Sequence, residues 1–188
     1  EAICKKFHRD NKIIYNPNQI VVSTGAKQSI ANVVQALIKP GEEVILLAPF
    51  WVSYSAIVLM ADGIPKILKS DISNDFKVSA KQIDDAISEK TKMIIINSPN
   101  NPSGSIYNKK ELYEIASVLK KYPNVFVLSD EIYEHINYGT EHVSFANIEG
   151  MYERTITVNG IAKAFAMTGW RIGYLGAPIW IAKACTKL

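Results

Sequence analysis

Short apolar runs, each bounded by turn residues, recur along the whole chain. They are rich in Val, Ile, Leu and Thr, a composition that favours β-strands. Seven such runs occur, at residues 20–23, 44–48, 65–68, 93–97, 125–129, 155–158 and 172–176. The runs MIIIN (93–97) and VFVLS (125–129) are apolar throughout rather than alternating. Continuous apolar strands are typical of sheets covered on both faces, so these runs predict a mainly parallel sheet.

Segments with the spacing of amphipathic helices lie between several of these runs. Four are predicted, at residues 26–38, 51–60, 80–87 and 109–121. Two of them begin with capping boxes, which pair Ser79 with Gln82 and Asn108 with Glu111. The alternation of strands and helices predicts an α/β fold, with a mainly parallel seven-stranded sheet and helices on both faces.

The start of the chain bears on its domain organisation. Residues 1–10 read as the tail of an amphipathic helix with Ile3 and Phe7 on one face, and the first residue is Glu1 rather than Met. We therefore expect residues 1–188 to be a single domain cut from a longer chain.

Composition and charge narrow the function classes. The chain has 188 residues, 48% of them hydrophobic, and 21 Lys+Arg against 18 Asp+Glu give a net charge of +3. This balance is typical of a soluble globular protein, and the absence of a basic block argues against nucleic-acid binding. The longest uncharged stretch, residues 44–61, is interrupted by Pro49 and by serines. It predicts a strand followed by a helix rather than a membrane span.

The cysteines and histidines give no sign of a disulfide or a metal site. Cys4 and Cys185 lie at opposite ends of the sequence and form no CxxC motif, which fits a reducing cytoplasm. His8, His135 and His142 are scattered without the spacing of metal ligands, so no metal is expected.

The residues that follow the predicted strands are the candidates for chemistry. In open α/β sheets, ligands bind beyond the carboxyl ends of the strands. Polar and special-geometry residues cluster after five of the runs, at residues 24–27, 49–51, 98–104, 130–133 and 159–163.

Three of these segments together resemble a known family. The motifs are NPSG (101–104), SDEIY (129–133) and VNGIAKAFAMTGWRIGY (158–174), in that order. They resemble the fold type I pyridoxal-phosphate enzymes, in particular class I aminotransferases of the bacterial aspartate aminotransferase subgroup. The resemblance implies pyridoxal 5'-phosphate as cofactor and a large cofactor-binding domain, with an N-terminal arm and a small C-terminal domain outside it. It also implies a homodimer of the full-length protein.

By this resemblance, Lys163 and Asp130 carry the central chemistry. Lys163 would form the Schiff base with the cofactor and then move the proton at the substrate α-carbon. Because residues 161–165 are otherwise apolar, we expect Lys163 to be buried. Asp130 would pair with the pyridine nitrogen of the cofactor and keep it protonated. The alternative for Asp130 is a carboxylate that only caps the following turn.

The resemblance assigns three further side chains to the cofactor ring. Tyr133 and Asn101 would hydrogen-bond its phenolic oxygen, and Trp51 would stack on its face. Each also has a purely structural alternative: a half-buried aromatic for Tyr133, a turn-forming Asn-Pro for Asn101, and a core position for Trp51.

The phosphate of the cofactor would be held by Arg171 and by the backbone amides of Gly25, Ala26 and Lys27 at the start of a helix. An ordinary strand-end arginine is the alternative for Arg171. The sequence departs from many relatives at residues 160–162, which offer no hydroxyl group near the lysine.

The substrate side of the site is expected to include Lys27, Trp51 and Asn101. In the aspartate aminotransferase subgroup, a lysine at the position of Lys27 meets the distal carboxylate of acidic substrates. The resemblance therefore implies aspartate as the amino donor.

The favoured function is a pyridoxal-phosphate-dependent aminotransferase that moves an amino group from an amino acid, with aspartate favoured, to a 2-oxo acid by a ping-pong mechanism. One alternative is a pyridoxal-phosphate-dependent C–S β-lyase that shares the same lysine, aspartate, tyrosine and arginine. Another is a sensor domain of a transcriptional regulator, preceded by a DNA-binding module. A nicotinamide-dependent dehydrogenase is disfavoured because no GxGxxG follows the first strand.

Overall fold

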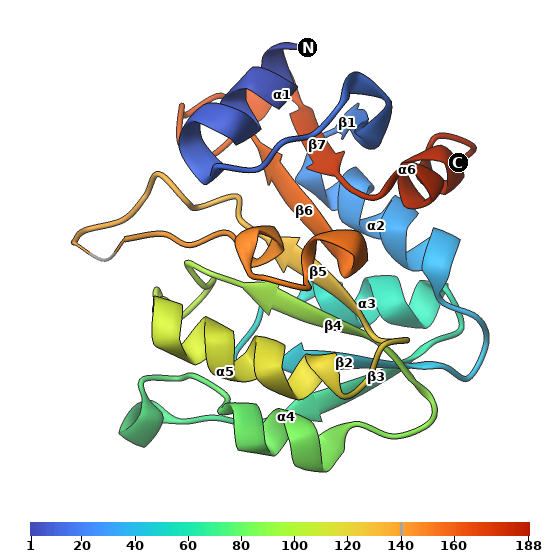
Figure 1. Cartoon of the computed structure of the whole chain (residues 1–188), viewed down its shortest axis with the longest axis vertical. Helices are drawn as coiled ribbons and strands as arrows, with labels where there is room; N and C mark the ends of the chain where they lie inside the picture. The colour runs from blue at the N-terminus through green and yellow to red at the C-terminus, as the bar shows by residue number, and fades with distance from the viewer. Residues whose placement is uncertain (140) are drawn as a thin grey trace.

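A computed structural model describes residues 1–139 and 141–188 and contains one seven-stranded sheet (Figure 1). The strands are β1 (Ile20–Thr24), β2 (Glu43–Leu47), β3 (Ile64–Leu68), β4 (Thr91–Asn97), β5 (Phe126–Asp130), β6 (Thr155–Gly160) and β7 (Ile172–Gly176). All seven were predicted from the sequence, with ends that differ by at most two residues. Their order across the sheet is β1-β7-β6-β5-β4-β2-β3.

The direction of β7 sets the geometry of the site. β7 runs antiparallel to both of its neighbours, β1 and β6, whereas the other neighbouring pairs are parallel. The sheet is therefore mainly parallel, as expected. Because β7 is reversed, its first residues lie at the edge where β1 and β6 end: Ile172 pairs with Thr24, and Gly173 pairs with Gly160.

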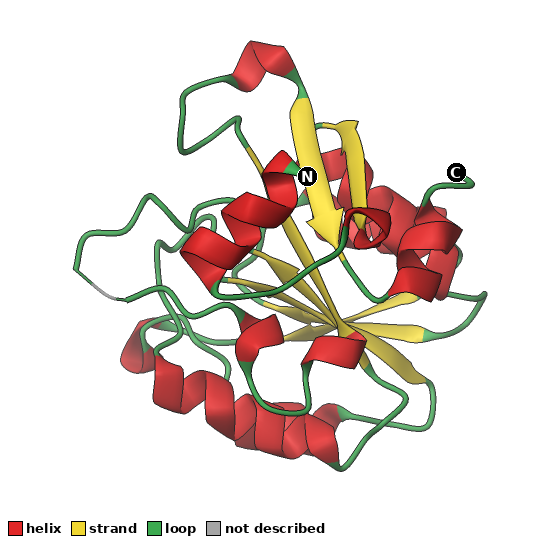
Figure 2. Ribbon diagram, turned by 45° about the horizontal axis from the view of Figure 1, so that its top comes forward, coloured by secondary structure: helices red, strands yellow, loops and turns green. Residues whose placement is uncertain are grey.

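Helices cover both faces of the sheet (Figure 2). One face carries α2 (Ala26–Leu37), α3 (Ser53–Met60) and α6 (Ile179–Cys185), and the other carries α4 (Ala80–Ala86) and α5 (Lys109–Lys120). In β2, Val44 and Leu46 join the core on the first face, while Ile45 and Leu47 join the core on the second. This two-sided burial is the reason for the continuous apolar runs.

The helix boundaries follow the capping signals. The side chains of Ser79 and Asn108 accept hydrogen bonds from the amides three residues later, so both predicted capping boxes are present. Helix α6 was not predicted. It has seven residues, follows β7 closely and has no side-chain cap, so the sequence offered neither length nor a start signal.

The N-terminal segment forms α1 (Ala2–Lys6) followed by a π-helical turn over Phe7–Asn11. Phe7 is fully buried in a small cluster with Tyr15 and Tyr174, and Ile3 packs against the same cluster. The predicted shared face of Ile3 and Phe7 is confirmed.

Buried Arg154 fixes the connection from α5 into β5. Its guanidinium donates hydrogen bonds to the carbonyl oxygens of Leu119, Tyr122 and Val125. These carbonyls lie at and beyond the C-terminus of α5, where the regular helical hydrogen-bond pattern ends. The contacts therefore hold the start of the strand that ends in Asp130.

The uncharged stretch 44–61 forms β2 and α3, as expected. Among the described residues, no helix combines the length and the apolar character needed to cross a bilayer. Both cysteines are free thiols.

Candidate active site

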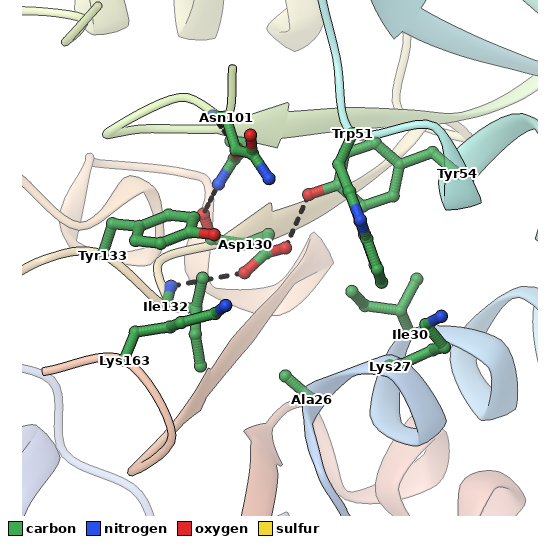
Figure 3. Close-up of a pocket in the computed structure, with 11 residues that line it drawn as sticks. Ala26, Lys27, Ile30, Trp51, Tyr54, Asn101, Asp130, Ile132, Tyr133 and Lys163 are labelled. Atoms are coloured by element: carbon green, nitrogen blue, oxygen red, sulfur yellow. Dashed lines mark hydrogen bonds between the residues drawn. The ribbon is translucent and has the colours of Figure 1, made fainter. Parts of the chain in front are cut away.

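A pocket lies at the edge where the parallel strands end (Figure 3). It is lined by Ala26, Lys27, Ile30, Trp51, Tyr54, Asn97, Asn101, Asp130, Ile132, Tyr133 and Lys163. Seven of the nine residues predicted for the site therefore line one pocket. The other two, Gly25 and Arg171, lie beside it in contact with each other.

Asp130 is the last residue of β5 and is buried at the base of the pocket. Its Oδ2 accepts a hydrogen bond from the hydroxyl of Tyr54 (2.5 Å), and its Oδ1 accepts one from the amide of Ile132 (3.2 Å). Burial raises the pKa of Asp130 to about 6, and the two hydrogen bonds oppose this shift. Oδ1 of Asp130 thus caps the following turn, as the structural alternative expects. That alternative does not explain why Oδ2 points into the pocket region and accepts a hydrogen bond from Tyr54.

Tyr133 and Asn101 meet on one side of the pocket, where a hydrogen bond joins their side chains (Figure 3). The position of Asn101 is fixed by Asn97, because the backbone amide of Asn101 donates a hydrogen bond to Oδ1 of Asn97 (2.8 Å). Burial and the nearby charge of Asp130 raise the pKa of Tyr133, so its hydroxyl remains a hydrogen-bond donor near neutral pH.

Lys163 lies at the mouth of the pocket, and its Nζ is 5.9 Å from the centre of the Tyr133 ring. The expectation that Lys163 is buried was wrong, because the residue is exposed. The chain leaves the sheet after Gly160 and forms a turn, so the apolar neighbours of Lys163 are not part of a buried strand. Phe165 itself is 55% exposed.

Trp51 and Lys27 face each other across the opposite side of the pocket. The Nζ of Lys27 lies 4.9 Å from the centre of the Trp51 ring, a cation–π distance. Trp51 is half-buried rather than a core residue, and its ring packs edge-on against Tyr54 with 5.5 Å between centroids. Its face therefore borders the pocket.

The elements for an anion site lie at the N-terminus of α2. The first-turn amides of Ala26 and Lys27 have no helical partners, which is the usual situation for binding a phosphate. Arg171 precedes β7, and its Nη1 donates to the carbonyl oxygen of Thr168 (3.0 Å). A Cβ atom at Gly25 would stand 2.4 Å from Nη2 of Arg171, so the guanidinium lies directly on the Gly25 backbone.

Sequence reasoning missed two polar residues of the pocket, Tyr54 and Asn97, and two apolar ones, Ile30 and Ile132. Tyr54 is three residues after Trp51 at the start of a helix, and this spacing could have placed both on one face. Asn97 is the last residue of β4, and it was passed over because only residues beyond the strands were considered. Its Nδ2 donates to the carbonyl oxygen of Asp130 (2.9 Å).

A buried ionic cluster lies behind the site. Glu131 accepts hydrogen bonds from the hydroxyls of Ser129 and Ser144 (both 2.8 Å), and Nε2 of His142 lies 3.1 Å from its carboxylate. Glu134 forms an ion pair with Lys6.

Glu134 makes further contacts in the cluster. It accepts a hydrogen bond from Asn11 (2.5 Å), and Nε2 of His135 lies 3.2 Å from it. Two of the three histidines that look scattered in the sequence are thus brought together beside buried carboxylates. Their ligand atoms lie within 4.8 Å of the neighbouring carboxylate oxygens, but the donors of Lys6 and Asn11 already engage Glu134.

Comparisons with known proteins match the whole chain to one family. The family model "Aminotransferase class I and II" matches residues 1–188. A bifunctional aspartate aminotransferase and glutamate/aspartate-prephenate aminotransferase of Petunia hybrida is 48% identical over 188 residues, covering 100% of this chain and 39% of that protein.

Two solved structures have the same fold. The aspartate aminotransferase of Rhizobium meliloti superimposes with a TM-score of 0.96 at 44% identity, covering 98% of this chain and 46% of that one. The aspartate aminotransferase of Thermus thermophilus with maleate gives 0.96 at 41% identity, covering 100% and 48%. The chain therefore spans less than half the length of these relatives. Since the family model covers every residue, the chain belongs to the class I and II aminotransferase family.

Proposed function

We propose that this chain is the cofactor-binding large domain of a pyridoxal-phosphate-dependent aminotransferase, and that aspartate is its amino donor. One observation carries the proposal: a buried carboxylate (Asp130), an amine (Lys163) and an anion site (Gly25 with Arg171) converge on one pocket. The full-length protein would transfer the amino group to a 2-oxo acid.

The donor set fits the proposed cofactor. A phosphate matches the amides of α2 and the planar guanidinium of Arg171. A phenolic oxygen matches the hydrogen-bonded pair of Tyr133 and Asn101, and a protonated ring nitrogen matches the carboxylate of Asp130. When bound, pyridoxal phosphate supplies an electron sink for the pair of electrons left when the substrate Cα–H bond breaks.

The residues of the chain would transfer the proton, provide a negative charge in the pocket and exclude water. The amine of Lys163 lies at the mouth of the pocket. There it could carry the proton between the substrate α-carbon and the cofactor. Asp130 holds a negative charge at the closed end, where few waters can compete with it. Trp51 and Ile132 supply apolar walls that exclude water from the reacting atoms.

The proposed donor rests on Lys27. Its ammonium group is exposed at the pocket rim, so it can meet the distal carboxylate of an acidic substrate without a burial cost. The Thermus thermophilus structure, with its dicarboxylate maleate, supports this assignment.

A cytoplasmic location and a homodimer are part of the proposal. The free thiols of Cys4 and Cys185 are compatible with a reducing compartment. Trp170 and Phe165 are 68% and 55% exposed close to Lys163 in the sequence, and a second copy of the chain could cover them. Sedimentation of the full-length protein measures the assembly directly.

The decisive experiment follows the absorbance of the bound cofactor in the purified full-length protein. Aspartate should change the spectrum, and a 2-oxo acid should reverse the change, without release of ammonia. Release of ammonia and a thiol from a sulfur amino acid would instead identify a β-lyase. A protein that takes up no cofactor would contradict the proposal altogether.

A further inference from the structure

The hydroxyl of Tyr54 has one hydrogen-bond partner among the described residues, the carboxylate of Asp130. Tyr54 is 2% exposed, and its ring is held between Trp51 and Phe50 at centroid distances of 5.5 and 6.4 Å. The ring therefore has little freedom to turn, and the 2.5 Å contact is built into the packing of α3 on the sheet.

The direction of this hydrogen bond is fixed by electrostatics. Burial, together with the charge of Asp130, raises the pKa of Tyr54 well above 10, so the phenol keeps its proton throughout the physiological range. Tyr54 must then donate and Asp130 must accept. A charge-assisted bond of this kind favours the ionised carboxylate over the neutral acid.

The other charged and titratable groups around Asp130 do not provide this support. Glu131, next to Asp130 in the chain, is a like charge that raises the pKa of Asp130, and Tyr133 donates no hydrogen bond to it. Lys163, after β6, and Lys27, on α2, line the same pocket without forming an ion pair with Asp130. The Tyr54 hydroxyl and the Ile132 amide are therefore the donors that offset the burial of this carboxylate.

We propose that Tyr54 is a positioning residue for the cofactor: its phenol orients Asp130 and keeps it ionised, so that the carboxylate can meet a protonated ring nitrogen. This rests on the proposed function, because it assumes that pyridoxal phosphate binds in this pocket. Tyr54 contacts Asp130 and would act on the cofactor through that carboxylate.

The test compares two ligands in the full-length protein and measures binding rather than turnover. One ligand is pyridoxal phosphate, and the other is its 1-deaza analogue, in which carbon replaces the ring nitrogen. Tyr54→Phe should lower the affinity for pyridoxal phosphate by about 10- to 100-fold, the range for losing a hydrogen bond to a charged group. It should also move the acid limb of the affinity–pH curve to higher pH. The affinity for the analogue should fall less than about twofold, because the analogue has no ring nitrogen for Asp130 to bind.

Two further variants separate positioning from pocket shape. Tyr107→Phe removes another buried hydroxyl, bonded to the backbone of Val78, and should leave both ligands unaffected. In an Asp130→Asn background, Tyr54→Phe should change the affinity for pyridoxal phosphate less than about twofold, because the shared carboxylate is gone.

Each other outcome has a distinct meaning. Equal losses for both ligands, or an unshifted pH curve, would overturn the role of Tyr54 while leaving the proposed function intact. If the wild-type protein binds neither ligand, the proposed function fails, and the role of Tyr54 fails with it.

Discussion

The guanidinium group of Arg171 lies against the backbone of Gly25, although the two residues are far apart in the sequence. A Cβ atom at Gly25 would stand 2.4 Å from Nη2 and 3.1 Å from Cζ of Arg171. The two residues meet because β7 is reversed, so its first residues pair with the last residues of β1. Arg171 has a φ of 51°, a left-handed conformation that costs a non-glycine residue about 1 kcal/mol or more. The fold retains this conformation at the position where the guanidinium would complete the proposed phosphate site with the first amides of α2.

Gly25→Ala is therefore expected to weaken cofactor binding by at least about tenfold. The added methyl group would displace Arg171 by contact, and one charged hydrogen bond is worth roughly that factor. The measurement is the dissociation constant for pyridoxal phosphate. Gly41→Ala is a matched control, because Gly41 has the same φ of +83° but nothing within 4 Å of an added Cβ. Both variants should lose similar stability, and only the first should lose affinity. Equal affinities would show that Arg171 does not serve the phosphate.

Lys163→Ala is expected to abolish the covalent link to the cofactor and nearly all turnover, while the melting temperature stays within a few degrees. The side chain is exposed, so the fold does not depend on it. Borohydride reduction of the wild-type protein, followed by peptide mass analysis, should label Lys163. Lys110→Ala is the control, since the side chain of Lys110 is 87% exposed on α5. Labelling of any other lysine would refute the assignment.

Asp130→Asn is expected to slow proton abstraction by several powers of ten while retaining the cofactor, because an amide does not stabilise a protonated ring nitrogen as a carboxylate does. Single-turnover kinetics with aspartate measure this step. Near-normal rates would leave Asp130 with a structural role only.

The same substitution should stabilise the cofactor-free protein at high pH. Burial raises the pKa of Asp130 from its ordinary value of 3.8 to about 6. Ionisation is therefore less favourable in the folded chain than in the unfolded one, and it costs about 3 kcal/mol of stability once the pH exceeds 6. Asparagine avoids this cost, so Asp130→Asn should be more stable than wild type at pH 8 by up to that amount. The gap should narrow as the pH falls from 6 and should close below pH 3.8, where Asp130 is neutral in the folded and the unfolded chain. A gap that is constant with pH would contradict the burial of a charge.

The sheet and most of the site could be predicted because both follow from local patterns. Strands such as β4 are apolar on both faces since helices cover both sides, and the ends of parallel strands share one edge. Asn101, Asp130 and Tyr133 were found by that rule alone as candidates, before any resemblance gave them roles. Arg171 obeys it too, once β7 is recognised as reversed.

The parts that sequence reasoning missed depend on contacts between distant elements. The pairing of Tyr54 with Asp130 joins α3, which packs on β2 and β3, to the end of β5, a contact that depends on strand order and that no local pattern records. The pairing of His142 with Glu131 likewise needs the chain to fold back after Tyr133. The exposure of Lys163 was misjudged because apolar neighbours predict burial only inside a regular strand or helix.

The pair of His142 and Glu131 should make stability depend on pH. Burial alone would lower the pKa of His142, but the hydrogen bond to Glu131 and its charge outweigh this and raise it above 6.5. The contribution of His142 to the free energy of unfolding is therefore complete below pH 6.5. It is lost as the pH rises through the raised pKa of His142 in the folded chain. Burial alone would raise the pKa of Glu131, but the contacts with His142 hold this pKa below 4.5. The stabilisation that ionised Glu131 provides is therefore lost only in stronger acid.

His142→Asn is thus expected to cost about 2 kcal/mol at pH 6, the scale of a buried hydrogen bond to a charge, and less at pH 9. Denaturant titrations at both values measure the difference. His8→Asn, at an exposed histidine, should show no such pH dependence. A cost for His142→Asn that is the same at pH 6 and pH 9 would mean that the imidazole acts by packing rather than by charge.

Lys27→Ala is expected to lower kcat/KM for aspartate by about 1.5–3 kcal/mol, the value of a hydrogen bond between two charged groups, and to change kcat/KM for an apolar amino acid far less. The ammonium group lies over the Trp51 ring, 4.9 Å from its centre, and this contact holds it at the pocket rim. Lys39→Ala, at an exposed residue just beyond the C-terminal end of α2, should leave kcat/KM for both substrates unchanged. Equal losses for aspartate and for the apolar amino acid would place Lys27 on the cofactor phosphate, and would remove the local reason for naming aspartate as the donor.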